Sequence, residues 1–131
     1  MIENLIDAPH KVYVEPTSAC NLSCATCVRH AWEEPEGFMA WETFEAVVDA
    51  LAPIDGHVVE PALSRPRTIA FMGLGEPLLH PRFLDMVRLA KRRGLRAEVT
   101  TNALLLGADL AAGLLEASLD QLVVSIDGSS A

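Results

Sequence analysis

Cysteine is missing from this chain except in one stretch of eight residues, basic side chains are few, and no long apolar run occurs. The 10 lysines and arginines are outnumbered by 18 aspartates and glutamates, which gives a formal net charge of -8 and disfavours general binding to nucleic acid or anionic membranes. No apolar run approaches a membrane span, and the first residues, MIENLIDAPHK, lack the order of a secretory signal. Clustered, unpaired thiols suit a reducing compartment. We therefore expect a cytoplasmic domain without nucleic-acid or membrane partners.

The rest of the sequence alternates between short β-rich runs and amphipathic helical segments. Four runs are typical of strands: KVYVEP (11–16), TIAF (68–71), RAEVTT (96–101) and QLVVSI (121–126). Helices are predicted from near Trp41, from Pro81 to Gly94, and over 108–119, because apolar residues recur there at helical spacing. Such alternation predicts a parallel α/β sheet in which helices connect the strands. No linker is apparent, so residues 1–131 are expected to form a single domain.

A polar or glycine-containing segment follows each predicted strand. The cysteine loop follows the first strand and GLGEP (73–77) follows the second, while TTN (100–102) closes the third and SIDG (125–128) closes the fourth. The carboxyl ends of parallel strands meet at one edge of the sheet, where such folds build their sites. The sequence therefore predicts one composite site at this edge.

The three cysteines, Cys20, Cys24 and Cys27, have the spacing C-x3-C-x2-C. Three thiolates on one loop can hold three corners of a four-iron, four-sulfur (4Fe–4S) cluster and leave the fourth iron open to a small molecule. An alternative is zinc, with His30 as the fourth ligand, in a small binding module that performs no chemistry. A dithiol switch between Cys24 and Cys27 is a further alternative, but it would leave Cys20 idle.

Four motifs in order, CNLSCATC, FMGLGEPLLHP, TTNALLL and VVSIDG, give the sequence a resemblance to the radical S-adenosylmethionine (radical SAM) superfamily. The resemblance implies a partial (β/α) barrel with about four parallel strands. It implies that the three cysteines bind a 4Fe–4S cluster and that S-adenosylmethionine chelates the open iron. An electron from a donor such as ferredoxin or flavodoxin would then lead to a 5′-deoxyadenosyl radical.

The same resemblance assigns roles to other residues expected at this edge of the sheet. Gly73, Leu74, Gly75 and Glu76 match the motif that contacts the methionine amino group. Glycines allow close approach of the backbone, and a carboxylate complements an ammonium, so a side chain at Gly75 is expected to weaken cofactor binding without removing iron. Asn102 and Ser125 match positions that contact the ribose or the methionine carboxylate, and Asp127 lies beside them.

Three departures from the family pattern are present. Thr26 replaces an aromatic residue that often precedes the last cysteine, and Leu74 replaces a second glycine. The family core usually has six β/α units, whereas four strands are predicted here. We therefore expect residues 1–131 to be a truncated core domain, the amino-terminal part of a radical SAM enzyme, with its cluster loop at 17–30.

The segment directly after the cysteines carries a narrower resemblance. TCVRHAWEEPEGFM (26–39) is similar to maturases for tungsten-cofactor oxidoreductases, a branch near the SPASM-domain modifiers of peptides and cofactors. This resemblance implies that the substrate is a peptide or a cofactor precursor.

Overall fold

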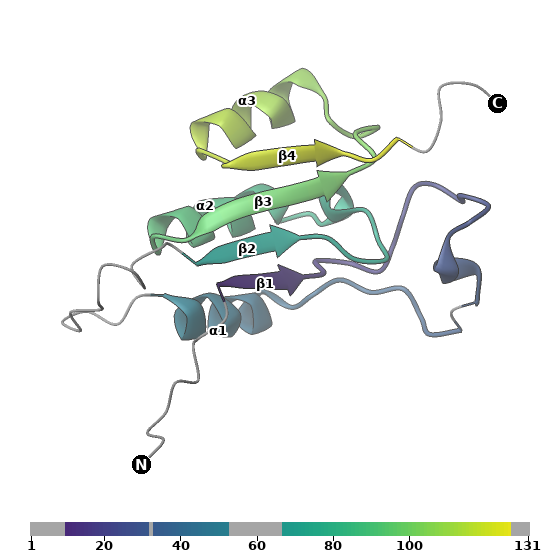
Figure 1. Cartoon of the computed structure of the whole chain (residues 1–131), viewed down its shortest axis with the longest axis horizontal. Coiled ribbons are helices and arrows are strands. Elements are labelled where there is room, and N and C mark those ends of the chain that lie inside the picture. Colours follow the sequence, from purple (N-terminus) through teal and green to yellow (C-terminus); the bar gives the residue numbers. More distant parts are fainter. Residues whose placement is uncertain (1–9, 32, 53–66, 127–131) are drawn as a thin grey trace, which may run out of the picture.

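A computed structural model describes residues 10–31, 33–52 and 67–126 of the chain, and these form a parallel α/β sheet (Figure 1). The strands are β1 (Lys11–Val14), β2 (Thr68–Phe71), β3 (Arg96–Thr101) and β4 (Gln121–Val124). They pair in the order β1-β2-β3-β4, and every pair is parallel. The predicted α/β class is confirmed, although β1 and β4 each end two residues earlier than the predicted runs.

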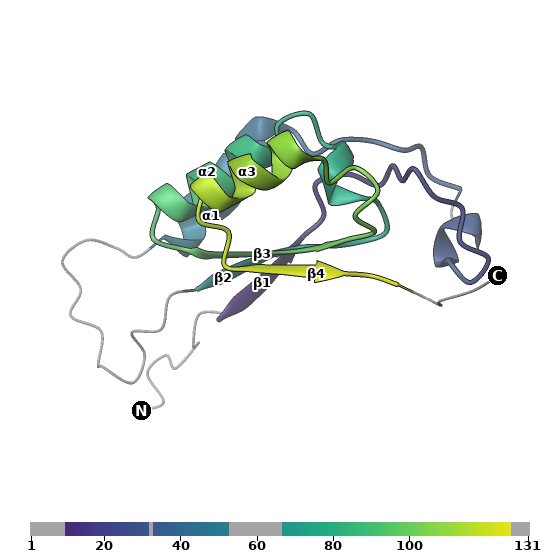
Figure 2. The ribbon, with the colours of Figure 1, turned by 90° about the horizontal axis from the view of Figure 1, so that it is seen from above.

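Three α-helices connect the strands and lie together on one face of the sheet (Figure 2). They are α1 (Trp41–Leu51), α2 (Phe83–Arg92) and α3 (Ala108–Glu116), and two short 3-10 helices, η1 (Val28–Ala31) and η2 (Pro77–Leu79), lie in the loops. The helix predicted from Pro81 begins at Phe83, because the preceding residues form a turn in which the Phe83 N–H donates to the carbonyl of His80. None of the helices in the described ranges is long and apolar enough to cross a membrane.

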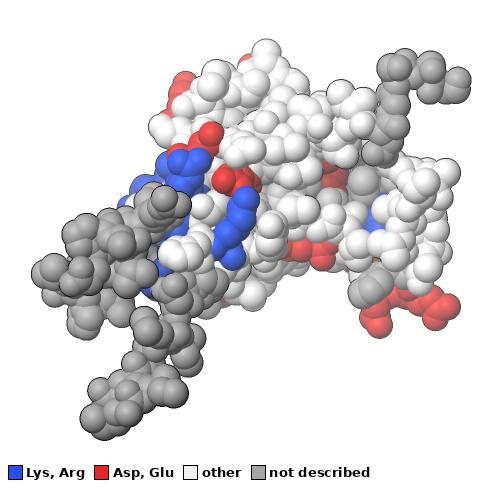
Figure 3. Space-filling model, in the orientation of Figure 1, with Lys and Arg blue, Asp and Glu red and all other residues white. Residues whose placement is uncertain are grey.

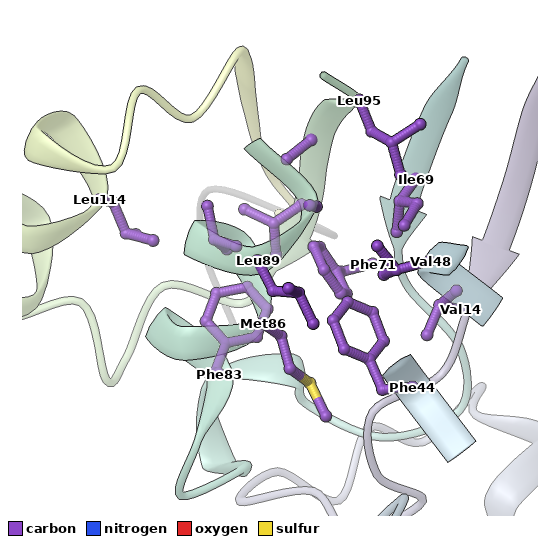
Figure 4. Packing of buried hydrophobic residues seen from close by; sticks show 14 of the residues in the cluster. Val14, Phe44, Val48, Ile69, Phe71, Phe83, Met86, Leu89, Leu95 and Leu114 are labelled. Atoms are coloured by element: carbon purple, nitrogen blue, oxygen red, sulfur yellow. The ribbon is translucent and has the colours of Figure 1, made fainter. Parts of the chain in front are cut away.

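The core lies between the sheet and the helices. The apolar stripe predicted for α2, Phe83, Met86, Val87 and Ala90, is fully buried, and TIAF is buried at all four positions, as a central strand requires. Phe71 on β2 packs against Phe44 of α1 and Phe83 of α2, with ring centroids 5.7 and 5.2 Å away (Figure 4). Each such side chain contributes roughly 1.5–3 kcal/mol by leaving water. This layer fixes the ends of the strands that carry the candidate site.

The end of α2 shows how local sequence positions the next strand. Gly94 has a positive φ of 74°, its N–H donates to Lys91 O, and the N–H of Leu95 donates to Ala90 O. This is the Schellman arrangement, in which glycine takes the left-handed conformation after a helix. The chain reverses there, and β3 begins at Arg96.

The face of the sheet opposite the helices is polar and open. Tyr13 is 65% exposed, and the ammonium of Lys11 pairs with the Glu98 carboxylate at 2.5 Å across the sheet. Figure 3 looks onto this face and shows the largest group of basic side chains toward the end where the strands begin. All residues of β4 are exposed as well. The edge of the sheet where the strands end therefore lies at the opposite end of the strands from the basic group.

Candidate functional site

The loops after all four strands meet at one edge of the sheet, toward which every strand arrow in Figure 1 points. They line a cavity of about 290 Å³. Its walls include nine of the residues predicted from the sequence, namely Cys20, Cys24, Cys27, Gly73, Leu74, Gly75, Glu76, Asn102 and Ser125. Asp127 lies outside the described residues. The structure thus brings together residues that are up to about a hundred positions apart, as the motif order predicted.

The cysteine loop is closed at its base by the segment that precedes α1. Thr17 and Phe38 form an antiparallel bridge, the Thr17 hydroxyl donates to Gly37 O at 2.7 Å, and the Ser18 N–H donates to the same carbonyl. The Thr17 hydroxyl also accepts from the N–H of Ala19 at 3.0 Å. Thr17 is 2% exposed. These contacts hold the two ends of the loop together, so its cysteines project from a fixed base.

The three cysteines are free thiols, each half-buried. The N–H of Cys27 donates to Cys24 O at 3.0 Å, which makes a tight turn between them. A ring nitrogen of His30, Nε2, lies 2.8 Å from the same Cys24 carbonyl, so this nitrogen donates to the backbone. Within the described ranges, no three His, Cys, Asp or Glu side chains surround a single point as ligands of one metal ion would. A 4Fe–4S cluster bonds each of its cysteine ligands to a different iron, so such ligands do not converge on one point, and three thiols from one loop are a donor set that it accepts.

Gly75 lies directly against the cysteine loop. A Cβ at this position would overlap the carbonyl oxygen of Thr17 and would lie 2.5 Å from that of Ala19. The next residue, Glu76, donates its N–H to Ala19 O at 2.8 Å. The structure therefore gives a reason for glycine that the sequence did not reveal: the bare backbone lets the loop after β2 pack on the loop after β1.

Glu76 is a buried carboxylate, 3% exposed, that links the ends of β2 and β3. Its Oε1 accepts from the N–H of Leu78 at 3.0 Å and from the hydroxyl of Thr101 at 2.7 Å. Among the residues that the structure describes, its Oε2 accepts from the N–H of Asn102, at 2.8 Å. A carboxylate oxygen has two lone pairs, so Oε2 keeps one acceptor site within the residues that line the cavity.

Asn102 joins the end of β3 to the cysteine loop. Its Nδ2 donates to Asn21 Oδ1 at 2.8 Å and lies 4.0 Å from Cys20 Sγ, while its Oδ1 accepts from the N–H of Leu104. Ser125 is held at the end of β4, where its N–H donates to Thr101 O at 2.9 Å. The predicted contacts of Asn102 and Ser125 with ribose or carboxylate stay predictions.

Sequence reasoning missed two side chains that support the site. Asn21 lies inside the cysteine motif, and Glu15, the residue after β1, accepts from backbone N–H groups of the loop after β2. One signal was available for Glu15: it is the carboxylate at the end of the first predicted strand, KVYVEP, next to the rim.

Comparison with known proteins identifies the family. The sequence pattern of the Radical SAM superfamily matches residues 14–131. The chain is 38% identical over 116 residues to a tungsten-containing aldehyde ferredoxin oxidoreductase cofactor-modifying protein of Pyrococcus furiosus, an alignment that covers 88% of this chain and 30% of the relative. It is 37% identical over 118 residues to a GTP 3′,8-cyclase of Chlorobaculum tepidum, covering 88% and 32%.

The fold agrees with this match. The crystal structure of BtrN in complex with AdoMet and 2-DOIA superimposes with a TM-score of 0.75 at 21% identity, covering 93% of this chain and 48% of that one. The matched pattern covers most of the sequence, and the chain belongs to the radical SAM superfamily. The cofactors of this family are a 4Fe–4S cluster and S-adenosylmethionine. Family membership does not support the zinc-module alternative. The chain spans about a third of the length of the curated relatives it matches.

Proposed function

We propose that this chain holds a 4Fe–4S cluster through Cys20, Cys24 and Cys27 and binds S-adenosylmethionine in the cavity beside them. The observation that carries the proposal is the cavity itself, because thiols, glycine backbone, carboxylate and amide from four strand ends line one space of about 290 Å³. When bound, the reduced cluster would supply the one electron needed to cleave a carbon–sulfur bond of S-adenosylmethionine and so start radical chemistry on a substrate.

The chain's own residues provide position and electrostatics. The base of the cysteine loop, held by Thr17 and Gly37, limits how far the thiolates move. The carboxyl group of Glu76 lies beside the cavity, and a carboxylate there would suit the ammonium of the methionine end. Asn102 and Ser125 line the cavity and offer polar groups to the ribose or the carboxylate. Asp127 is proposed as a further cofactor-binding residue. Leu22 and Met72 contribute apolar surface to the same cavity.

The proposed substrate is a peptide or a cofactor precursor. This proposal is supported by the relative from Pyrococcus furiosus, which is named as a cofactor-modifying protein, and by a mycofactocin maturase of Mycobacterium ulcerans that is 26% identical over 129 residues. The proposed electron donor is a ferredoxin or flavodoxin, and the proposed compartment is the cytoplasm, where thiols remain reduced. Residues 1–131 are proposed to act as one core domain.

Anaerobic reconstitution tests the function directly. The full chain, loaded with iron and sulfide, should show a cluster signal in electron paramagnetic resonance after reduction with dithionite, and added S-adenosylmethionine should change that signal. Under the same conditions, 5′-deoxyadenosine and methionine should form in equal amounts. A chain that carries its cluster but neither changes its signal nor binds S-adenosylmethionine by calorimetry would contradict the proposal.

A further inference from the structure

Glu15 lies behind the glycine-rich segment without being part of the cavity wall. Its Oε1 accepts a very short hydrogen bond from the N–H of Leu74 and a second one from the N–H of Gly75 at 3.3 Å. Gly73, Leu74 and Gly75 all line the cavity, whereas Glu15 does not. The carboxylate therefore holds two successive peptide groups of this segment from outside.

The planarity of the peptide bond determines what these hydrogen bonds do. No cis peptide bond occurs in the described part of the chain, and in a trans peptide the N–H and the preceding C=O point in opposite directions. Because the N–H groups of Leu74 and Gly75 point at Glu15, the carbonyl groups of Gly73 and Leu74 point away from it. Carbonyl oxygens accept hydrogen bonds from an ammonium, and the cofactor proposed for this cavity carries one.

We propose that Glu15 is a positioning residue that turns the carbonyl oxygens of Gly73 and Leu74 toward the methionine ammonium of S-adenosylmethionine. The inference rests on the proposed function. A carboxylate suits the role because hydrogen bonds to an ionised acceptor are stronger than those to a neutral one. It can also accept both N–H groups on one oxygen.

The same geometry explains the glycine at position 73. A Cβ there would lie 2.6 Å from both Cγ and Cδ of Glu15, so any side chain would displace this carboxylate. Gly75 differs, because its Cβ would meet backbone atoms of Thr17 and Ala19. An alanine at position 73 therefore moves only the end of a pliable side chain, and it should reproduce the loss of Glu15 while leaving the backbone contacts of the cysteine loop intact.

The test compares variants of the full chain after anaerobic reconstitution. Glu15→Ala and Gly73→Ala should each weaken S-adenosylmethionine binding roughly tenfold by calorimetry, which corresponds to about 1.4 kcal/mol. Glu15→Gln keeps one acceptor oxygen, so its affinity for S-adenosylmethionine should fall at most about threefold. Glu98→Gln is the matched control, because it removes a carboxylate from the same face of the sheet, where Glu98 pairs with Lys11, and it should leave the affinity unchanged.

Two readouts separate positioning from a general structural effect. Hydrogen exchange measured by mass spectrometry should become faster in the segment 73–76 of Glu15→Ala, with no matching change in α2. Affinity for an S-adenosylmethionine analogue that lacks the amino group should fall much less than affinity for S-adenosylmethionine itself. A general structural defect would lower the affinity for both compounds equally.

Each outcome has a clear meaning. If the parent chain with an intact cluster does not bind S-adenosylmethionine, the proposed function fails and this role fails with it. If the parent binds and both Glu15→Ala and Gly73→Ala bind equally well, only the role of Glu15 is overturned. If Glu15→Ala loses its iron, Gly73→Ala becomes the deciding variant. Equal losses of its affinity for S-adenosylmethionine and for the amino-free analogue would then overturn the inference.

Discussion

Gly75 packs against Ala19 so closely that a Cβ on Gly75 would lie 2.5 Å from the Ala19 carbonyl oxygen. The hydrogen bond from the Glu76 N–H to that same oxygen, at 2.8 Å, continues the contact. Because Ala19 directly precedes Cys20, the glycine-rich segment and the cysteine loop form one structural unit. A substitution in one of them should therefore alter the position of the other.

The first prediction follows from this contact. Gly75→Ala should push the cysteine loop away, because backbone atoms cannot move aside as a side chain can, and it should reduce both iron content and S-adenosylmethionine binding. The sequence alone suggested a loss of cofactor binding with iron retained. Iron content per chain and calorimetry measure the two effects. Gly37→Ala is the matched control: a Cβ there meets nothing within 4 Å, and the variant should reconstitute like the parent.

The second prediction concerns the ligands of the cluster. Alanine at Cys20, Cys24 or Cys27 should abolish the visible absorption of the reconstituted protein, since each thiolate is proposed to bond to a different iron. His30→Ala should keep the absorption, because the described contact of the His30 side chain is with the Cys24 carbonyl. Loss of iron in His30→Ala comparable to that of the cysteine variants would instead indicate a ligand set that includes the imidazole.

The third prediction addresses the buried carboxylate. Glu76 accepts from three donors, the Leu78 N–H, the Thr101 hydroxyl and the Asn102 N–H. In Glu76→Gln the side-chain NH2 group must face one of these donors, and the resulting unsatisfied contact should lower the free energy of unfolding by about 1–3 kcal/mol. Urea unfolding measures the change. Glu116→Gln, at an exposed position of α3, should stay within about 0.5 kcal/mol of the parent.

The fourth prediction is a pH dependence at Asp120. Burial raises the pKa of this carboxyl, but hydrogen bonds from the Lys91 ammonium and the Ala97 N–H outweigh that effect, and Arg96 adds attraction, so the pKa lies below its usual value. A depressed folded-state pKa stabilises the protein above the unfolded-state pKa of about 3.9, and this stabilisation is lost as the pH falls through the folded-state pKa. Asp120→Asn should therefore cost up to about 1 kcal/mol near neutral pH.

The measurement is a comparison of urea unfolding for Asp120→Asn and the parent at several pH values. The free energies of unfolding of the two proteins should converge in acid, where Asp120 of the parent is protonated. A difference that stays constant across the range would contradict the prediction, because it would show that ionisation of Asp120 contributes nothing to stability.

Much of the fold could be predicted because the relevant signals are local. The spacing of Phe83, Met86, Val87 and Ala90 describes one helix face, and their burial confirms it. The run TIAF is predicted to be a buried strand, and it lies between β1 and β3 with all four of its residues buried. The convergence of four motifs at one rim follows from the parallel direction of the strands alone.

The supporting contacts of the site could not be predicted, because they join residues that are distant in sequence. Glu15 and Gly75 are 60 positions apart, and Asn21 and Asn102 are 81 apart. Each pair depends on the register between strands, which the hydrophobic pattern does not fix for the loops beyond the strand ends. The reason for glycine at position 75 is of the same kind, since it lies in the path of another loop and has no local signature.

The strand order β1-β2-β3-β4 has a consequence for how the molecule is made. Among the described strands, each later one pairs with the strand that precedes it in the sequence, so its partner has left the ribosome before it does. The segments of the site are made in the same order. The cysteine loop after β1 comes first, the glycine-rich segment after β2 packs on it, and Asn102 after β3 hydrogen-bonds to the cysteine loop. Synthesis from the amino terminus therefore produces the segments of the candidate site in the order in which they contact one another.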